Sequence, residues 1–170
     1  NQKGGVGKTT TVVNLAASLS IMGHTTLVVD LDPQGNATTG LGKSNTKEVN
    51  NIYNLLIGNI KLNEAIINTD INNLDLISST VNLSGFEVET ATNEDRAFTL
   101  KNIFDSNSNI LNKYDYIFID CPPSLSLLTV IALVGSNELL VPLQTEFFAL
   151  EGITQLINTI DRIKEKLNPK

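Results

Sequence analysis

The segment Lys3–Thr10, with the sequence KGGVGKTT, combines residue types that could hold a phosphate group. Glycine loses the most backbone freedom on ordering, so a glycine run is expected where the backbone itself approaches a ligand. An apolar-periodic stretch begins at Val12, and this predicts a loop that opens onto a helix whose N-terminus favours an anion. We expect Lys8 to reach the β- and γ-phosphates of a nucleotide and the Thr9 hydroxyl to lie on Mg²⁺. The predicted nucleotide-binding residues are Lys3, Gly4, Gly5, Val6, Gly7, Lys8, Thr9 and Thr10.

Two apolar segments of strand length end in carboxylates. They are Thr25–Asp30, TTLVVD, and Tyr114–Asp120, YDYIFID, and apolar strands between helices are typical of a parallel sheet covered on both faces. Ligands of such sheets bind at the carboxyl ends of the strands. Asp30, Asp32 and Asp120 are therefore candidates for binding Mg²⁺ and for positioning water. The alternative interpretation of the first loop is a turn in which Asp and Asn side chains bond the backbone.

The rest of the pattern alternates helices with strands, which predicts an α/β fold with a mostly parallel β-sheet and helices on both faces. We expect helices over residues 9–22, 51–57, 62–67, 81–90, 97–111, 125–133 and 149–167, and further strands over 73–78 and 138–143. No repeat or linker divides the chain, so residues 1–170 are interpreted as a single domain. A phosphate loop normally follows a buried strand. We therefore expect a fragment that lacks its first strand and its C-terminal part.

Composition limits the functional classes. The formal net charge of −6 is not that of a dedicated DNA-binding domain, so any nucleic-acid binding must come from a local patch or from residues outside this sequence. No apolar run approaches the length of a membrane span, and no signal peptide is visible. The single cysteine, Cys121, fits a reducing cytosol. A small buried residue is the favoured interpretation of Cys121, because no histidine is paired with it as in a cysteine nucleophile.

The phosphate loop resembles the deviant Walker A motif, KGGxGK[ST], of the ParA/MinD/nitrogenase-iron-protein class of P-loop NTPases. It departs from the usual P-loop pattern, which has glycine where Gln2 stands. The segments DLDPQGNAT, DCPPSLSLLT and QTEFFALEGITQL are similar to those of ParA/Soj partition ATPases. The resemblance covers residues 2–23, 27–40, 115–129 and 138–157. The nitrogenase iron protein is disfavoured because it needs further cysteines for its cluster, and MinD-like proteins because of the DPQGN and CPPS segments.

The resemblance implies an ATP- and Mg²⁺-dependent ATPase that dimerises and segregates or positions chromosomal or plasmid DNA. It implies catalytic roles for three residues: Lys3 reaches the nucleotide of a partner subunit, Lys8 holds phosphates, and Asp32 positions the attacking water. Thr9, Asp30 and Asp120 are implied to support the Mg²⁺ shell. The implied partners are a second copy of the chain, nonspecific double-stranded DNA bound mainly outside these residues, and a ParB-type activator, with no membrane. The implied location is the cytoplasm, in association with the nucleoid.

Two other functions stay open. One is a MinD-like ATPase that positions a membrane-bound or protein cargo. The other is a nucleotide-dependent scaffold with little turnover. Partition ATPases usually read T-x-N-A-L where this chain has TVIAL over residues 129–133, so Ile131 replaces a polar amide. This departure concerns the coupling of the segment after Asp120 to the nucleotide, and it leaves the scaffold open.

Overall fold

The computed structural model describes residues 5–43, 49–143 and 149–168 of the chain. Within these ranges four strands form one sheet in the order β2-β3-β1-β4. β1 (Thr26–Asp30) is parallel to both of its neighbours, β3 (Leu74–Ile77) and β4 (Tyr116–Asp120), while β2 (Ile66–Asn68) is antiparallel to β3. The sheet is thus mostly parallel, as the sequence predicts, and the carboxyl ends of β1, β3 and β4 share one edge.

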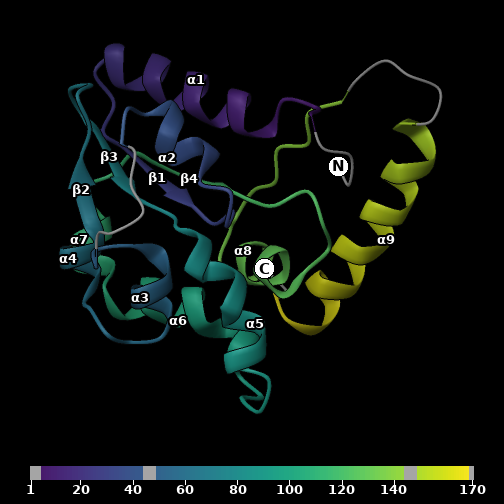
Figure 1. Ribbon diagram of the computed structural model, residues 1–170. Helices are drawn as coiled ribbons and strands as arrows, with labels where there is room; N and C mark the ends of the chain where they lie inside the picture. Colours follow the sequence, from purple (N-terminus) through teal and green to yellow (C-terminus); the bar gives the residue numbers. More distant parts are fainter. Residues whose placement is uncertain (1–4, 44–48, 144–148, 169–170) are drawn as a thin grey trace.

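Helices cover both faces of the sheet (Figure 1). α1 (Lys8–Ile21) and the short α2 (Asn36–Gly40) lie on one face. The other face carries, in chain order, α3 (Ile52–Leu56), α4 (Leu62–Ala65), the 3₁₀ helix η1 (Val81–Gly85), α5 (Phe86–Glu89), the 3₁₀ helix η2 (Arg96–Phe98), α6 (Thr99–Ser106), α7 (Ser108–Leu111) and α8 (Leu127–Val134). α9 (Ala149–Lys166) packs against α8 and runs along the side of the molecule (Figure 1).

The central strand β1 is buried along its whole length. Leu27 and Val29 belong to the larger core cluster, on the face covered by α3–α8, while Val28 belongs to the smaller cluster beneath α1. Successive side chains of a strand point to opposite faces. A strand with apolar helices on both sides therefore has consecutive apolar residues, as residues 27–29 of β1 are.

Two predicted elements differ from the structure. Residues 62–67 are not one helix, because α4 ends at Ala65 and Ile66 begins β2, where pairing with β3 outweighs the helical spacing. The strand predicted over residues 138–143 is not formed, and Leu139, Leu140 and Leu143 are 48%, 62% and 52% exposed. A strand requires a hydrogen-bonding neighbour, and none of the four described strands pairs with this segment.

The remaining helical predictions hold with changes at their ends. Residues 81–90 are divided between η1 and α5, and residues 97–111 between η2, α6 and α7. The division between α6 and α7 falls at Asn107, inside the polar SNSN stretch. α2 was not predicted. Among the helices of the described ranges, none has the length and apolar character needed to cross a membrane.

Candidate nucleotide site

The glycine loop meets the N-terminus of α1, as the sequence predicts. Gly5 and Gly7 have φ angles of +81° and +89°, which residues with a Cβ rarely adopt. Gly7 is the N-cap of α1, and in the described part of the chain no side chain caps that end. The helix therefore presents its positive end to the loop, as an anion site requires. Lys3 and Gly4, also predicted to bind nucleotide, lie outside the described residues.

Thr9 and Asp120 meet beneath this loop, although 111 positions separate them in the sequence. The Thr9 hydroxyl donates a hydrogen bond of 2.7 Å to Oδ2 of Asp120. Asp120 is 1% exposed, and its Oδ1 has no hydrogen-bond partner among the described residues. A buried carboxylate oxygen without a partner is costly, and a bound cation would satisfy it. Thr9 and Asp120 thus have the chemistry to hold Mg²⁺, and they are two of the three residues, with Asp30, that the sequence predicts at the metal site.

The parallel register places a second carboxylate beside this pair, because Asp30 of β1 is the direct partner of Asp120 of β4. Burial raises the pKa of Asp120, the Thr9 hydrogen bond and the charge of Lys8 lower it, and the charges of Asp30 and Asp32 raise it, with a net pKa of about 6. Burial also raises the pKa of Asp30. The edge of the sheet therefore concentrates negative charge that a cation would relieve.

The described residues contain no group of three or more His, Cys, Asp or Glu side chains placed to surround a metal ion. Mg²⁺ commonly binds through one or two protein oxygens, together with phosphate oxygens and water. A site built from Thr9 and Asp120 matches this preference. The remaining ligands would come from the nucleotide and from solvent.

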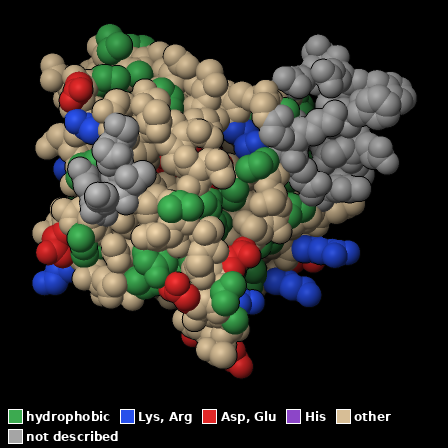
Figure 2. All heavy atoms as spheres, in the orientation of Figure 1, with side chains coloured by type: hydrophobic (Ala, Val, Ile, Leu, Met, Phe, Trp, Pro, Cys, Tyr) green, Lys and Arg blue, Asp and Glu red, His purple; other side chains and the backbone are tan. Residues whose placement is uncertain are grey.

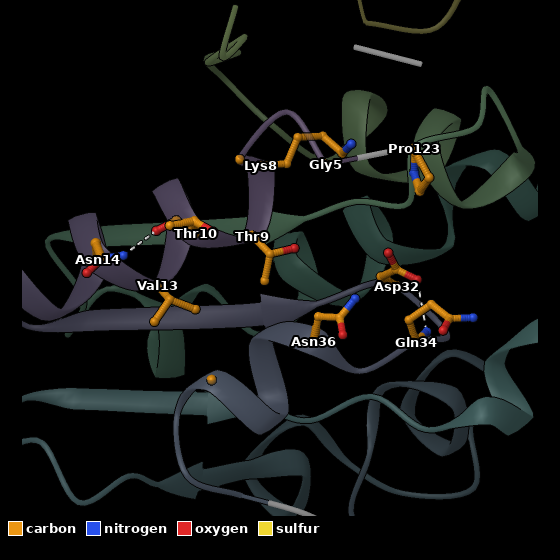
Figure 3. Close-up of a pocket in the computed structure, with 12 residues that line it drawn as sticks. Gly5, Lys8, Thr9, Thr10, Val13, Asn14, Asp32, Gln34, Asn36 and Pro123 are labelled. Atoms are coloured by element: carbon orange, nitrogen blue, oxygen red, sulfur yellow. Dashed lines mark hydrogen bonds between the residues drawn. The ribbon is translucent and has the colours of Figure 1, made fainter. Parts of the chain in front are cut away.

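Asp30 and Asp32 have different environments. Oδ2 of Asp30 accepts hydrogen bonds of 2.7 Å from both the backbone N–H and the hydroxyl of Thr38, and Oδ1 accepts one of 3.2 Å from the Asp32 N–H. Asp30 therefore organises the loop after β1, and it would act on the Mg²⁺ shell through that loop. Oδ1 of Asp32 accepts a hydrogen bond of 2.9 Å from the Gln34 N–H. Its other oxygen points away from Gln34, toward the side where Pro123 lies (Figure 3).

A single cavity of about 580 Å³ joins these elements (Figure 3). Its wall comes from the glycine loop, the first two turns of α1, the loop after β1, the short helix α2 and the segment after β4. The lining residues are Gly5, Gly7, Lys8, Thr9, Thr10, Val13, Asn14, Asp32, Gln34, Asn36, Gly40 and Pro123. This volume is in the range of small-molecule sites. Of the predicted residues, Val6, Asp30 and Asp120 lie buried behind the wall instead.

Sequence reasoning missed the α1 and α2 side of the cavity. Val13 and Asn14 lie one turn after Thr10 on the same helix, and Asn36 and Gly40 belong to α2. The spacing of Thr10 and Asn14, four residues apart on a helix that begins at the loop, was a signal that could have identified Asn14.

Three residues determine how the segment after β4 is packed and held: Cys121 within it, Ile131 in the helix that follows, and Glu87, which bonds the start of that helix. Burial, with the charges of Asp120 and Asp32, raises the pKa of Cys121 to about 12, so its thiol stays protonated and the packing interpretation is supported. Ile131 is fully buried in the larger core cluster, where it packs α8. The carboxylate of Glu87, on α5, accepts a hydrogen bond from the Leu127 N–H at the start of α8. That helix is therefore capped by a residue 40 positions away in sequence.

The parallel sheet, the glycine loop at the start of α1 and the Thr9–Asp120 contact at the carboxyl edge define a P-loop-type nucleotide-binding protein. A family model described as an AAA domain, AAA_31, matches residues 1–170, so the chain belongs to this family, within its ParA/Soj partitioning branch. The resemblance stated from the sequence is thereby confirmed.

The relatives give the extent of this similarity. The chain is 44% identical over 171 residues to the chromosome partitioning protein ParA of Caulobacter vibrioides (strain NA1000 / CB15N), covering 100% of the chain and 63% of that protein. It is 45% identical over 168 residues to the sporulation initiation inhibitor protein Soj of Bacillus subtilis (strain 168), covering 99% and 65%. The chain thus spans less than two thirds of the length of these curated relatives.

A solved structure shares the fold and holds ligands. It is the cobyrinic acid a,c-diamide synthase from Mycobacterium smegmatis with bound ADP and magnesium. The TM-score is 0.91 and the identity 36%, with 99% of this chain and 67% of that chain covered. A structure of the same protein contains an ATP analogue and magnesium. Homologues therefore bind the nucleotides and the metal ion that the sequence predicts for this site.

Magnesium should stabilise this protein more at about pH 8 than at about pH 5. The folded-state pKa of Asp120, about 6, lies above its ordinary value of 3.8, so the folded state binds the proton more tightly than the unfolded state. In the metal-free protein the contribution of this carboxyl group to stability therefore falls as pH rises from 3.8 to about 6. The deprotonated form of Asp120 is also the form that binds a cation. Thermal unfolding with saturating ADP, with and without Mg²⁺, measures the difference.

Asp120→Asn is the control, because it removes the titrating group while ADP titrates equally in both proteins. In this variant the gain in melting temperature from Mg²⁺ should become smaller and depend less on pH, because only the titration of ADP remains. An equal gain at both pH values in the unsubstituted protein would contradict the assignment of Asp120 to the metal site.

Proposed function

We propose that this protein is an ATP-dependent dimerising switch, which hydrolyses ATP to ADP and phosphate and thereby segregates or positions chromosomal or plasmid DNA. The buried Thr9–Asp120 contact beneath the glycine loop carries the proposal, because it leaves one carboxylate oxygen without a partner where Mg²⁺ would bind. The names of the relatives, a chromosome partitioning protein ParA and a Soj protein, support the cellular role.

Phosphoryl transfer needs little covalent chemistry from a protein, but it needs positive charge where negative charge develops and an oriented water. The backbone of residues 4–9 and the Lys8 ammonium would hold the phosphates. Thr9 and Asp120 would hold Mg²⁺, which when bound neutralises charge on the phosphate oxygens. Asp32, with one carboxyl oxygen directed away from Gln34, would orient the attacking water. Lys3 of a second copy would complete the site and make hydrolysis depend on dimerisation.

The proposed partners are a second copy of the chain, nonspecific double-stranded DNA and a ParB-type activator that stimulates hydrolysis. The formal net charge is −6, and the face shown in Figure 2 intersperses acidic and basic side chains without a continuous basic surface. DNA binding is therefore expected to use a local patch or residues outside this sequence. The proposed location is the cytoplasm, at the nucleoid.

The test is ATP turnover by the full-length protein with and without nonspecific duplex DNA. We expect DNA to stimulate turnover at low salt and the stimulation to disappear at high salt, because phosphate contacts release counterions. ATP binding without any response to DNA would instead favour a MinD-like positioning ATPase. ATP binding without turnover, even when DNA and a membrane are supplied, would favour the scaffold.

A further inference from the structure

Thr38 joins two segments that flank the site without itself lining the cavity. Its hydroxyl donates a hydrogen bond of 2.7 Å to Oδ2 of Asp30 and accepts one of 2.9 Å from the backbone N–H of Ser79. Ser79 follows the end of β3 and lies 41 positions from Thr38 in the sequence. One hydroxyl therefore connects the end of β1 to the segment after β3.

The chemistry of this bridge leaves few substitutes for a hydroxyl group. Thr38 and Ser79 are 5% and 6% exposed, and Asp30 is 0% exposed, so water cannot easily replace a lost bond. An ionised carboxylate only accepts hydrogen bonds and a backbone N–H only donates them, whereas a hydroxyl does both. Valine has nearly the shape of threonine but would leave the Ser79 N–H and part of the Asp30 carboxylate unsatisfied in the interior.

A second observation places the loop after β1 near Ser79. Gly35 has a φ angle of +62°, and a Cβ on it would lie 3.4 Å from the Ser79 carbonyl oxygen. Gly35, in the loop between β1 and α2, therefore lies near Ser79, the residue whose N–H bonds Thr38 of α2. Asp32 precedes Gly35 in this loop, and its N–H donates a hydrogen bond to Oδ1 of Asp30.

We propose that Thr38 is a positioning residue, which fixes the loop over residues 31–35 to the segment after β3 and so sets the place of the Asp32 carboxylate in the cavity. The proposal rests on the proposed function in one respect, because Asp32 orients water only if the protein hydrolyses ATP. Thr38 itself contacts neither the phosphates nor the water. It acts through Asp30 and the loop.

Three variants of the full-length protein test this role. Thr38→Val removes the hydroxyl, Thr38→Ser restores it, and Thr39→Val changes the exposed neighbouring threonine of α2. In Thr38→Val we expect kcat to fall by about 10- to 100-fold, since small misplacements of a reacting group have effects of this size. The dissociation constant of ATP should change by less than about threefold, because Thr38 does not line the cavity. Thr38→Ser should restore most of kcat, and Thr39→Val should leave it unchanged.

Amide hydrogen exchange gives a measurement that does not need turnover. Exchange of the Ser79 and Gln34 N–H groups should accelerate by about tenfold or more in Thr38→Val and stay slow in Thr38→Ser, because the first loses the anchor and the second keeps it. Unchanged exchange and unchanged kcat in Thr38→Val would overturn the inference while leaving the proposed function intact. Accelerated exchange in a protein without any turnover would support the anchor and reject the proposed function. A parallel loss of ATP binding, or no rescue by serine, would also overturn the positioning role.

Discussion

Replacing Lys8 with alanine should abolish detectable ATP binding and lower turnover by at least about 10²-fold. Lys8 begins α1, lines the cavity beside the glycine loop and lowers the pKa of Asp120 through its charge. Its ammonium is therefore placed to offset both the phosphates and the carboxylates at this edge of the sheet. Equilibrium binding of a fluorescent ATP analogue and steady-state turnover measure the two effects.

The matched control is Lys101→Ala. Lys101 forms an exposed ion pair of 2.7 Å with Asp105, four residues later on α6, and such pairs contribute little to stability. Removing it also takes one positive charge from the protein but none from the cavity. ATP binding by Lys8→Ala within about threefold of the unsubstituted protein would contradict the assignment of Lys8 to the phosphates.

Replacing Asp32 with alanine should leave ATP binding intact and lower turnover by about 10²–10⁴-fold, the range typical of a group that activates a nucleophile. Asp32 lines the cavity and directs one carboxyl oxygen away from its bond to Gln34. It is not the carboxylate that Thr9 contacts, so Mg²⁺ and the nucleotide should still bind. Turnover at saturating ATP, with binding measured separately, distinguishes the two steps.

Asp95→Ala serves as the control for lost negative charge, because Asp95 is exposed and its side chain does not cap the helix that follows it. It should change neither binding nor turnover. Loss of ATP binding in Asp32→Ala would show that Asp32 has a structural role, since its carboxylate also accepts the Gln34 N–H and could be needed to shape the loop.

The parts of the site that the sequence predicts are those with strong local signals. KGGVGKTT indicates a loop and a helix start within a few residues, and the apolar strands β1 and β4 end at the acids that the structure brings together. Parallel strands share their carboxyl edge, so the meeting of Thr9 with Asp120 follows from the order of elements.

The parts that the sequence does not predict depend on distant partners. Ile66 and Ile67 form β2 only because β3 lies alongside, and the apolar segment 138–143 lacks such a neighbour among the described strands. The turn interpretation and the metal interpretation of Asp30 could not be separated from its type and spacing. The hydrogen bonds of Thr38 to Asp30 and Ser79 decide that Asp30 organises the loop.

The segment of residues 79–87 supports both loops of the site. At one end the Ser79 N–H holds Thr38, and at the other the Glu87 carboxylate holds the start of α8, which follows the loop after Asp120. The loop that carries Asp32 and the loop that follows Asp120 are therefore both held by residues 79–87, and neither Ser79 nor Glu87 lines the cavity. A displacement of one loop that moves residues 79–87 would strain the hydrogen bond that holds the other loop. We therefore expect a ligand that displaces one loop to move the other as well.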